Sequence, residues 1–209
     1  MMVDNLLSAF TVLFVVIDPI GVAMIFAALT HRHSENQRRR MAITGTVLSG
    51  AILLTFFVLG NSLLTMLGIT LPAFRIAGGI LLFLLAIEMV VVRQSSGLRS
   101  TTVREQDEAE HKEDVSVFPL AFPLIAGPGG ITTVLLMSAE SDGLTDSMGL
   151  IGVLTLIMAL MLLCLLFAAN IAHRLGETGT NVISRLLGLI LAALAMQYIL
   201  DGVKEGLLV

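Results

Sequence analysis

Two short motifs combine helix-breaking residues with groups that could bind a small ligand. Asp18-Pro19-Ile20-Gly21 places an acid before a proline, and Ala126-Gly127-Pro128-Gly129-Gly130-Ile131-Thr132-Thr133 surrounds a proline with glycines and adds two threonines. Neither motif continues a regular helix, because proline lacks a backbone N–H and glycine costs backbone entropy. Both motifs lie inside apolar segments, where a break is tolerated only if protein or water satisfies the freed backbone groups.

The first motif has the residue types of a helix start. Asp is a preferred N-cap residue, and Pro is favoured at the first helical position. We therefore expect Asp18 to cap a half-helix that runs from Pro19 to about Thr30, after a first half that ends near Ile17. Gly127-Pro128 is expected to open the corresponding half-helix of the second motif.

Two such half-helices, with their N-termini facing each other, would form a site for a small zwitterion. A helix N-terminus offers free N–H groups and about half a positive charge, which favours a carboxylate. Asp18 adds a negative charge for an ammonium group, and the threonines add hydroxyl groups. The predicted substrate-binding residues are Asp18, Pro19, Gly21, Gly127, Pro128, Gly129, Gly130, Thr132 and Thr133.

The alternative is that proline and glycine only kink the helices and that Asp18 only caps one of them. For a single break this structural interpretation would be preferred, since kinks are common in membrane helices. Two matching breaks, one of them with an acid inside the membrane, favour a functional site.

The elements that must position these residues are apolar segments. Of the 209 residues 56% are hydrophobic and only 13% are charged, whereas a soluble domain carries about 25% charged residues. This composition indicates an all-α polytopic membrane protein in the lipid bilayer, and the net charge of −4 argues against a nucleic-acid partner. Six segments read as transmembrane helices of about 20 residues. They are 6–29, 41–66, 76–92, 115–138, 149–169 and 182–200.

The two halves of the chain repeat. Pro19 and Pro128 are 109 positions apart, and Arg75 and Arg185 are 110 positions apart. Each half has three crossings, so the second half must enter the membrane from the opposite face. This pattern predicts one transmembrane domain (1–209) made of two inverted three-helix repeats, with helices 1 and 4 broken at Asp18-Pro19 and Gly127-Pro128. Its expected parts are repeat one (about 1–92), a charged connector (93–114) and repeat two (about 115–209).

The distribution of Lys and Arg sets the expected orientation. Nine basic residues lie in the connectors after the first, third and fifth segments, and the other face offers Lys204 and Arg75. Because positive loops stay in the cytoplasm, both termini are expected to be periplasmic. The nine residues are Arg32, Arg38, Arg39, Arg40, Arg93, Arg99, Arg104, Lys112 and Arg174.

Other polar residues of the apolar segments first suggest structural roles. Arg75 and Arg185 begin helices and are expected to reach the interface as anchors, with a gate salt bridge as the alternative. Glu88 is expected to pair with Arg93 at the interface. Three amides are expected to hydrogen-bond between helices: Asn61, Asn170 and Gln197.

No enzyme motif accompanies the breaks. The sequence has no His-Glu-x-x-His, no Gly-x-Ser-x-Gly and no pair of cysteines, and its histidines lie in connectors. Asp18 is the one acid expected deep in the membrane, so a two-aspartate protease is not supported. We therefore predict no enzymatic activity, no metal site and no cofactor.

The chain resembles the MarC family over nearly its whole length. The likeness rests on the Asp18-Pro19-Ile20-Gly21 motif, on Arg75-Ile76-Ala77-Gly78-Gly79 with Arg185-Leu186-Leu187-Gly188, and on the long stretch from Phe118 to Thr133. The resemblance implies a six-span protein of the bacterial inner membrane and a neutral-amino-acid-transporter-like activity. One departure concerns the first motif, which in the family usually continues Asp-Pro-x-Gly-Asn-x-Pro. Here Val22 and Met24 occupy the last two defined positions.

The leading hypothesis is a secondary transporter that moves small neutral amino acids by alternating access. H⁺ or Na⁺ is the coupling ion that Asp18 could carry, and a homo-oligomer is compatible with the sequence. The alternative is a membrane scaffold or regulatory subunit that has the same fold and transports nothing.

Overall fold

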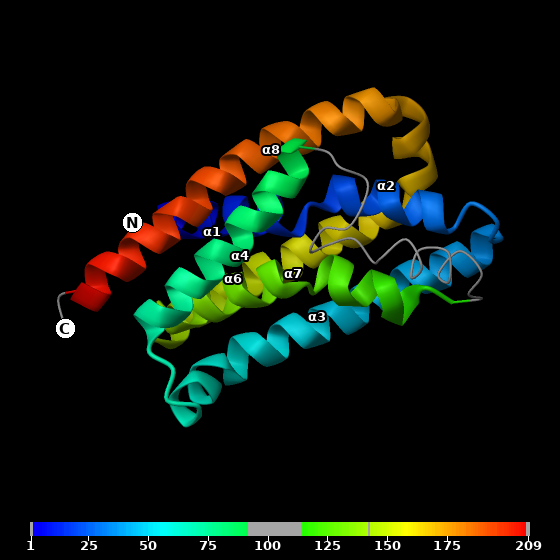
Figure 1. The fold of residues 1–209 in the computed structure, drawn as a ribbon. Helices are drawn as coiled ribbons and strands as arrows, with labels where there is room; N and C mark the ends of the chain where they lie inside the picture. The colour runs from blue at the N-terminus through cyan, green and yellow to red at the C-terminus, as the bar shows by residue number, and fades with distance from the viewer. Residues whose placement is uncertain (1, 92–113, 142, 208–209) are drawn as a thin grey trace.

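The computed structural model describes residues 2–91, 114–141 and 143–207, and every regular element in these ranges is a helix. The predicted all-α class is therefore confirmed. The helices, labelled in Figure 1, are α1 (Met2–Ile17), α2 (Pro19–Leu29), α3 (Glu35–Met66), α4 (Leu71–Val91), η1 (Ser116–Ile125), α6 (Pro128–Ala139), α7 (Leu144–Leu166) and α8 (Ala168–Leu207).

The described helices supply the length and apolarity that a membrane protein needs. Five spans are long and apolar enough to cross a bilayer, and η1 with α6 makes a sixth if that bent pair is counted as one span. The first of the five, Leu6–Leu29, runs through the break between α1 and α2. The multi-pass character is thus clear, while the count of six crossings and the inverted repeat stay predictions.

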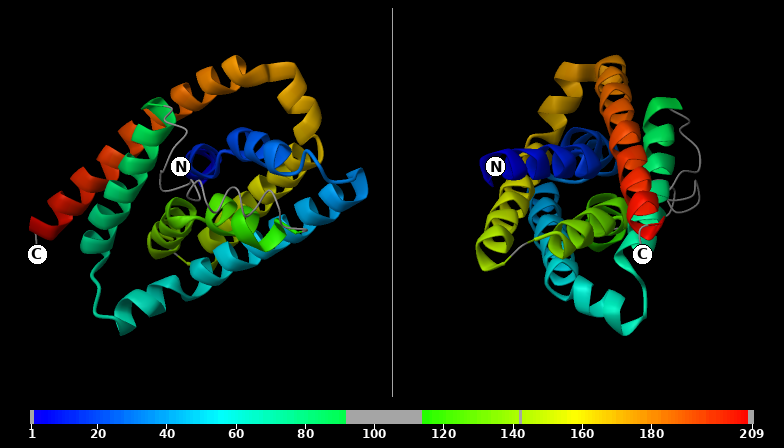
Figure 2. Two further views of the ribbon diagram at one scale, coloured as in Figure 1. Left: turned by 45° about the vertical axis from the view of Figure 1, so that its right-hand side comes forward. Right: turned by 90° about the vertical axis from the view of Figure 1, so that its left-hand side faces the viewer.

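The spans run back and forth between two ends of the bundle (Figure 1). We call the end where α1 begins and α8 finishes the terminal end; α4 also begins there, and α6 finishes there (Figures 1 and 2). We call the opposite end the basic end, because Arg32, Arg39 and Arg40 are exposed there. The turn that links α2 to α3 lies at this end (Figure 1). The start of α1 and the finish of α8 thus lie at the same end of the bundle, as an even number of crossings requires.

The broken span made of α1 and α2 lies in the interior. Within its most apolar window 56% of the residues are buried, against 22% for the span Thr178–Leu207 of α8. Helix α6 is also interior, with Val134, Leu135 and Leu136 at most 2% exposed. The two elements that follow the breaks are therefore shielded by the rest of the bundle.

Helices α4 and α8 lie side by side along most of their length (Figures 1 and 2). Their backbones approach closely at glycines: a Cβ on Gly79 would lie 2.8 Å from the Ala195 carbonyl oxygen, and one on Gly202 would lie 2.9 Å from the Pro72 carbonyl oxygen. Small residues permit such contacts between membrane helices, where close packing replaces the hydrophobic effect as a driving force. We treat α4 and α8 as one tightly packed pair.

Helix α8 corrects the predicted boundaries. A connector was expected between the segments 149–169 and 182–200, but the backbone stays helical from Ala168 to Leu207 apart from a bend at Gly176. Gly176 has φ 60°, a left-handed conformation that glycine adopts without steric cost. Gly176 thus separates two helical stretches and redirects the chain between them, and the apolar span of α8 begins after it, at Thr178.

The predicted partners of several polar side chains are also corrected. Gln197 donates from Nε2 to Asp201 Oδ1 at 2.9 Å within α8, so its expected bond to another helix is wrong. The side chains of Asn61 and Asn170 lie on exposed helix faces. Residues 93–113, most of the expected connector, fall outside the described residues, and so does Arg93, the expected partner of Glu88.

Candidate functional site

The first break is built around Asp18. The backbone of Asp18 has φ 51°, which turns the chain between α1 and α2. Its side-chain Oδ1 accepts a hydrogen bond from the Gly21 N–H at 3.1 Å. A Cβ on Gly21 would lie 2.1 Å from Asp18 Oδ2, so only glycine leaves room for the carboxylate. Asp18 is 3% exposed. The predicted cap and the helix end at Ile17 are confirmed.

The second break differs from the first. Pro128 is the first residue of α6, as predicted, and Gly127 precedes it with an extended backbone. No side chain among the described residues caps this helix, so its first-turn N–H groups keep the positive end of the helix dipole uncovered. The axes of η1 and α6 meet at 55°. One break is therefore capped by an acid, and the other is open.

The element before the second break was not anticipated by the sequence analysis. η1 is a wide, irregular helix with extended backbone at Phe118 and Phe122, each of which precedes a proline. The Ala121 carbonyl oxygen accepts from the Ala126 N–H at 2.9 Å, and Ser49 Oγ of α3, which donates to the Gly45 carbonyl oxygen at 2.6 Å, lies 3.3 Å from the same Ala121 oxygen. Two Phe-Pro pairs four residues apart are the sequence signal for this irregularity.

The two breaks lie next to each other inside the bundle. Val16, two residues before Asp18, would lie 3.4 Å from a Cβ on Gly129. At the second break, against Val16 at the end of α1, is a cavity of about 20 Å³, which has room for about one water molecule. It is lined by Val16, Leu81, Leu85, Pro123, Leu124, Ile125, Gly127, Pro128, Gly129 and Gly130. The site is closed in this conformation.

The predicted site residues divide into two groups. Gly127, Pro128, Gly129 and Gly130 line the cavity, whereas Asp18, Pro19, Gly21, Thr132 and Thr133 do not. The lining residues that the sequence did not predict come from α1, α4 and η1; they are apolar side chains without a chemical motif.

The two threonines contribute to packing in this conformation. Thr133 Oγ1 donates to the Gly129 carbonyl oxygen at 2.9 Å within α6. The methyl group of Thr132 occupies the space above Gly78 of α4, where a Cβ would lie 2.1 Å from Thr132 Cγ2. Helix α6 is therefore fitted against α4 just beyond its first turn.

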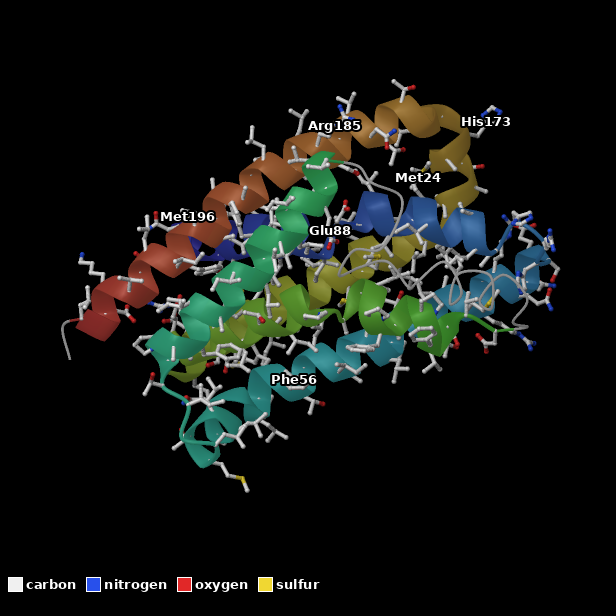
Figure 3. All side chains as sticks on the ribbon, in the orientation of Figure 1. Met24, Phe56, Glu88, His173, Arg185 and Met196 are labelled. Carbon is white, nitrogen blue, oxygen red and sulfur yellow. The ribbon has the colours of Figure 1, made fainter. Side chains whose placement is uncertain are left out.

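An ion-pair cluster lies at the terminal end, beyond the C-terminus of α6. Arg75 is 7% exposed. Its Nη2 donates to Glu140 Oε1 and its Nη1 to Glu205 Oε1, both at 2.5 Å. The expectation of an interfacial anchor is wrong for Arg75, and the alternative of a salt bridge is correct. Arg185, its counterpart in the second half, is exposed on α8 beside the end of α4 (Figure 3).

A larger cavity of about 300 Å³ adjoins this cluster between α1, α6, α7 and α8. Carboxylates and hydroxyl groups line one part of it, and aliphatic side chains line the rest. Its residues are Leu6, Ser8, Ala9, Val12, Met137, Glu140, Ser141, Asp146, Leu150 and Tyr198. Within the described ranges, no group of three or more His, Cys, Asp or Glu residues is arranged to hold a metal ion.

Comparison with known proteins gives relatives that extend over the whole chain. A UPF0056 membrane protein of Methanocaldococcus jannaschii is 35% identical over 201 residues, which is 96% of each chain. The UPF0056 membrane protein YvbG of Bacillus subtilis is 37% identical over 204 residues, or 98% of this chain and 96% of its own. A UPF0056 membrane protein of Aquifex aeolicus is 32% identical over 95% of this chain and 92% of its own.

These relatives come from archaea as well as bacteria, so the likeness alone does not imply a bacterial inner membrane. No solved structure matches the chain. The model of the MarC family of integral membrane proteins matches residues 3–207. With that match and the full-length relatives, the chain belongs to the MarC family of integral membrane proteins.

Proposed function

We propose that this protein is a secondary transporter that holds its substrate at the paired breaks. The observation that carries the proposal is the contact between the two breaks: Val16, at the end of α1, would lie 3.4 Å from a Cβ on Gly129, at the start of α6, and each break interrupts an apolar span. Discontinuous helices near the membrane midplane form the substrate and ion sites of several transporter folds. In this proposal the two halves, about 1–92 and about 115–209, are the two inverted repeats.

The unlike chemistry of the two breaks supports a zwitterionic substrate. The uncapped start of α6 offers the N–H groups of Gly129 and Gly130 to a carboxylate. Asp18, buried at the neighbouring break, offers a negative charge to an ammonium group or to a coupling H⁺ or Na⁺. Small neutral amino acids are the class that the family resemblance implies. They carry an ammonium group, a carboxylate and only a small side chain. We propose them as the substrate class, and transport rather than catalysis as the activity.

The proposed transport cycle requires a conformational change. A cavity of about 20 Å³ is far too small for an amino acid, so the present conformation is the occluded state of this cycle. The movable wall in this cycle is α6 with η1. It faces α4 through Gly129, where a Cβ would lie 3.0 Å from Leu82 Cδ2. Movement of α6 away from α4 enlarges the cavity at the uncapped amides.

The proposed setting is a cell membrane with the terminal end outside. The exposed arginines at the basic end support that orientation through their preference for the cytoplasmic face. In this orientation α1 begins, and α8 finishes, on the outer side.

The alternative is a membrane scaffold or regulatory subunit, and the small size of the cavity is the observation that favours it. In that case the breaks shape the bundle, and no amino acid binds between them. Amino-acid flux across a membrane separates the two functions, because a scaffold leaves the solute gradient unchanged.

Ligand-dependent thermal stabilisation of the purified protein tests the proposed binding. We expect alanine, serine or another small neutral amino acid to raise the unfolding temperature in a concentration-dependent way, since a ligand that binds the native state stabilises it. Matched ligands that lack the ammonium or the carboxylate group, such as propionate and ethylamine, should have no effect. Equal stabilisation by propionate and alanine would argue against recognition of a zwitterion.

A further inference from the structure

We infer that Arg75, Glu140 and Glu205 form an ion-pair gate at the terminal end of the bundle. Arg75 lies near the start of α4, Glu140 directly follows α6, and Glu205 lies near the end of α8. One guanidinium group thus joins three helices at the same end of the molecule (Figure 1).

The gate is connected to the cavity at the breaks by the interface between α4 and α6. Arg75 and Glu140 close the terminal end of this interface. At its inner end Gly129 faces Leu85, whose Cδ2 would lie 3.3 Å from a Cβ on the glycine, and both residues line the small cavity. The two helices that the Arg75–Glu140 pair joins are therefore two walls of the cavity. Separation of α4 and α6 at the terminal end opens their interface toward the small cavity.

The two ion pairs of Arg75 have different mechanical consequences. The pair with Glu205 joins α4 to α8, whose backbones are already in contact at Gly79 and Gly202. The pair with Glu140 joins α4 to α6, where a Cβ on Gly78 or on Gly129 would meet side-chain atoms rather than backbone. Loss of the Glu205 pair should leave the packed α4–α8 pair intact, whereas loss of the Glu140 pair frees the end of α6.

The exposure of the three groups allows the pair to open. Arg75 has only 8% of its side chain exposed, so it needs at least one anionic partner at all times. Glu140 and Glu205 each have 47% of the side chain exposed, so water can solvate either carboxylate after it leaves. Because Arg75 has two partners, it can release Glu140 and remain paired with Glu205.

The larger cavity gives the released Glu140 space to move. Glu140 lines this cavity of about 300 Å³ together with Tyr198, whose hydroxyl group can donate a hydrogen bond to a carboxylate, and with Ser141, whose hydroxyl group donates to the Ser138 carbonyl oxygen at 2.8 Å. The gate residue thus faces Arg75 on one side and a polar, open volume on the other. Gate opening is a step of transport only if the proposed function is correct. Opening of the Arg75–Glu140 pair is inferred from the contacts of the three residues and does not depend on that function.

Cysteine accessibility tests the gate without any substrate. Leu85, buried on the cavity wall, is replaced by cysteine in a Cys164→Ser background, which removes the only native thiol. The rate of modification by a water-soluble methanethiosulfonate is then measured on the protein in detergent micelles. Adding Glu140→Gln should raise this rate by about fivefold, the change expected from one partly exposed ion pair.

Two matched variants make the result specific. Glu205→Gln removes the other partner of Arg75 and should raise the rate much less, because the glycine contacts keep α4 on α8. Glu35→Gln removes an exposed carboxylate at the basic end and should leave the rate unchanged. If Glu140→Gln does not fold, Glu140→Asp keeps the charge on a shorter side chain, and it should give a smaller increase in the same direction.

An unchanged rate in folded Glu140→Gln and Glu140→Asp proteins would overturn the gate. Equal increases in the Glu140→Gln and Glu35→Gln proteins would also overturn it, because they would reveal general loosening. The assay uses no amino acid, so a protein that fails to transport can still support the gate. Conversely, transport without any effect of Glu140→Gln on accessibility would leave the proposed function standing and remove the gate.

Discussion

Substitutions of Asp18 separate its structural role from any role of its charge. The structure gives this residue two local tasks: it caps α2 through the Gly21 N–H, and it holds a left-handed backbone with φ 51°. Asn performs both tasks, because it ranks with Asp as an N-cap and tolerates the left-handed region. Asp18→Asn should therefore be about as stable as the wild type.

Alanine and glycine at the same position lose different parts of this stability. Asp18→Ala loses the cap, at about 1 kcal/mol, and keeps a Cβ in a left-handed conformation, at about 1–2 kcal/mol more. We expect its free energy of unfolding to fall by about 2–3 kcal/mol. Asp18→Gly loses the side-chain cap but has no Cβ, so its stability should lie close to that of the wild type.

The assay combines unfolding in detergent with substrate flux on the same preparations. The expected order of stability is wild type and Asn highest, Gly close behind and Ala lowest. If the charge of Asp18 binds an ammonium group or a coupling cation, all three variants lose flux regardless of their stability. Wild-type flux in Asp18→Asn at every pH would show that the charge is not used. An Ala variant as stable as the Asn variant would refute the structural argument.

Three further predictions follow from the helix contacts and the distribution of charge. Gly78→Ala should destabilise the protein by about 1–3 kcal/mol, because its Cβ would lie 2.1 Å from Thr132 Cγ2. Thr132→Ser in the same protein removes that methyl group, so it should restore most of the lost stability, as measured by thermal unfolding. Gly129→Ala with Gly130→Ala should give a folded protein that binds no ligand in the thermal-shift assay, since the Gly129 methyl group would lie against Leu82 and Leu85 and the Gly130 methyl group 3.3 Å from the Ile125 carbonyl oxygen, at two residues that line the small cavity. Normal binding by this variant would mean that the glycines serve packing alone. A periplasm-active reporter fused after Val209 should be active, because the exposed arginines lie at the opposite end of the bundle; activity of only a cytoplasmic reporter there would contradict the orientation.

The local chemistry of the two breaks could be predicted from the sequence, because proline and N-cap residues act over a few positions. The end of α1 at Ile17, the cap by Asp18 and the start of α6 at Pro128 follow from rules of that kind. Composition was likewise sufficient for the all-helical, multi-pass class. These features need no knowledge of what lies across the bundle.

Features that depend on distant neighbours were missed. Arg75 looks like an interfacial anchor until the fold brings Glu140 and Glu205 to it from two other helices. The threonines of the second motif look like free hydroxyl groups until α4 packs on α6. Long-range pairings of this kind leave no local pattern in a single sequence.

Exchange of amino acids across liposomes tests the central claim most directly. Purified protein is reconstituted, the liposomes are loaded with unlabelled alanine or serine, and uptake of the labelled amino acid is followed. The account predicts protein-dependent exchange of small neutral amino acids that is absent in the Gly129→Ala, Gly130→Ala protein and normal in the Glu35→Gln control. Equal, background-level uptake with and without wild-type protein, in liposomes where the protein is folded and a panel of neutral amino acids has been tried, would contradict it.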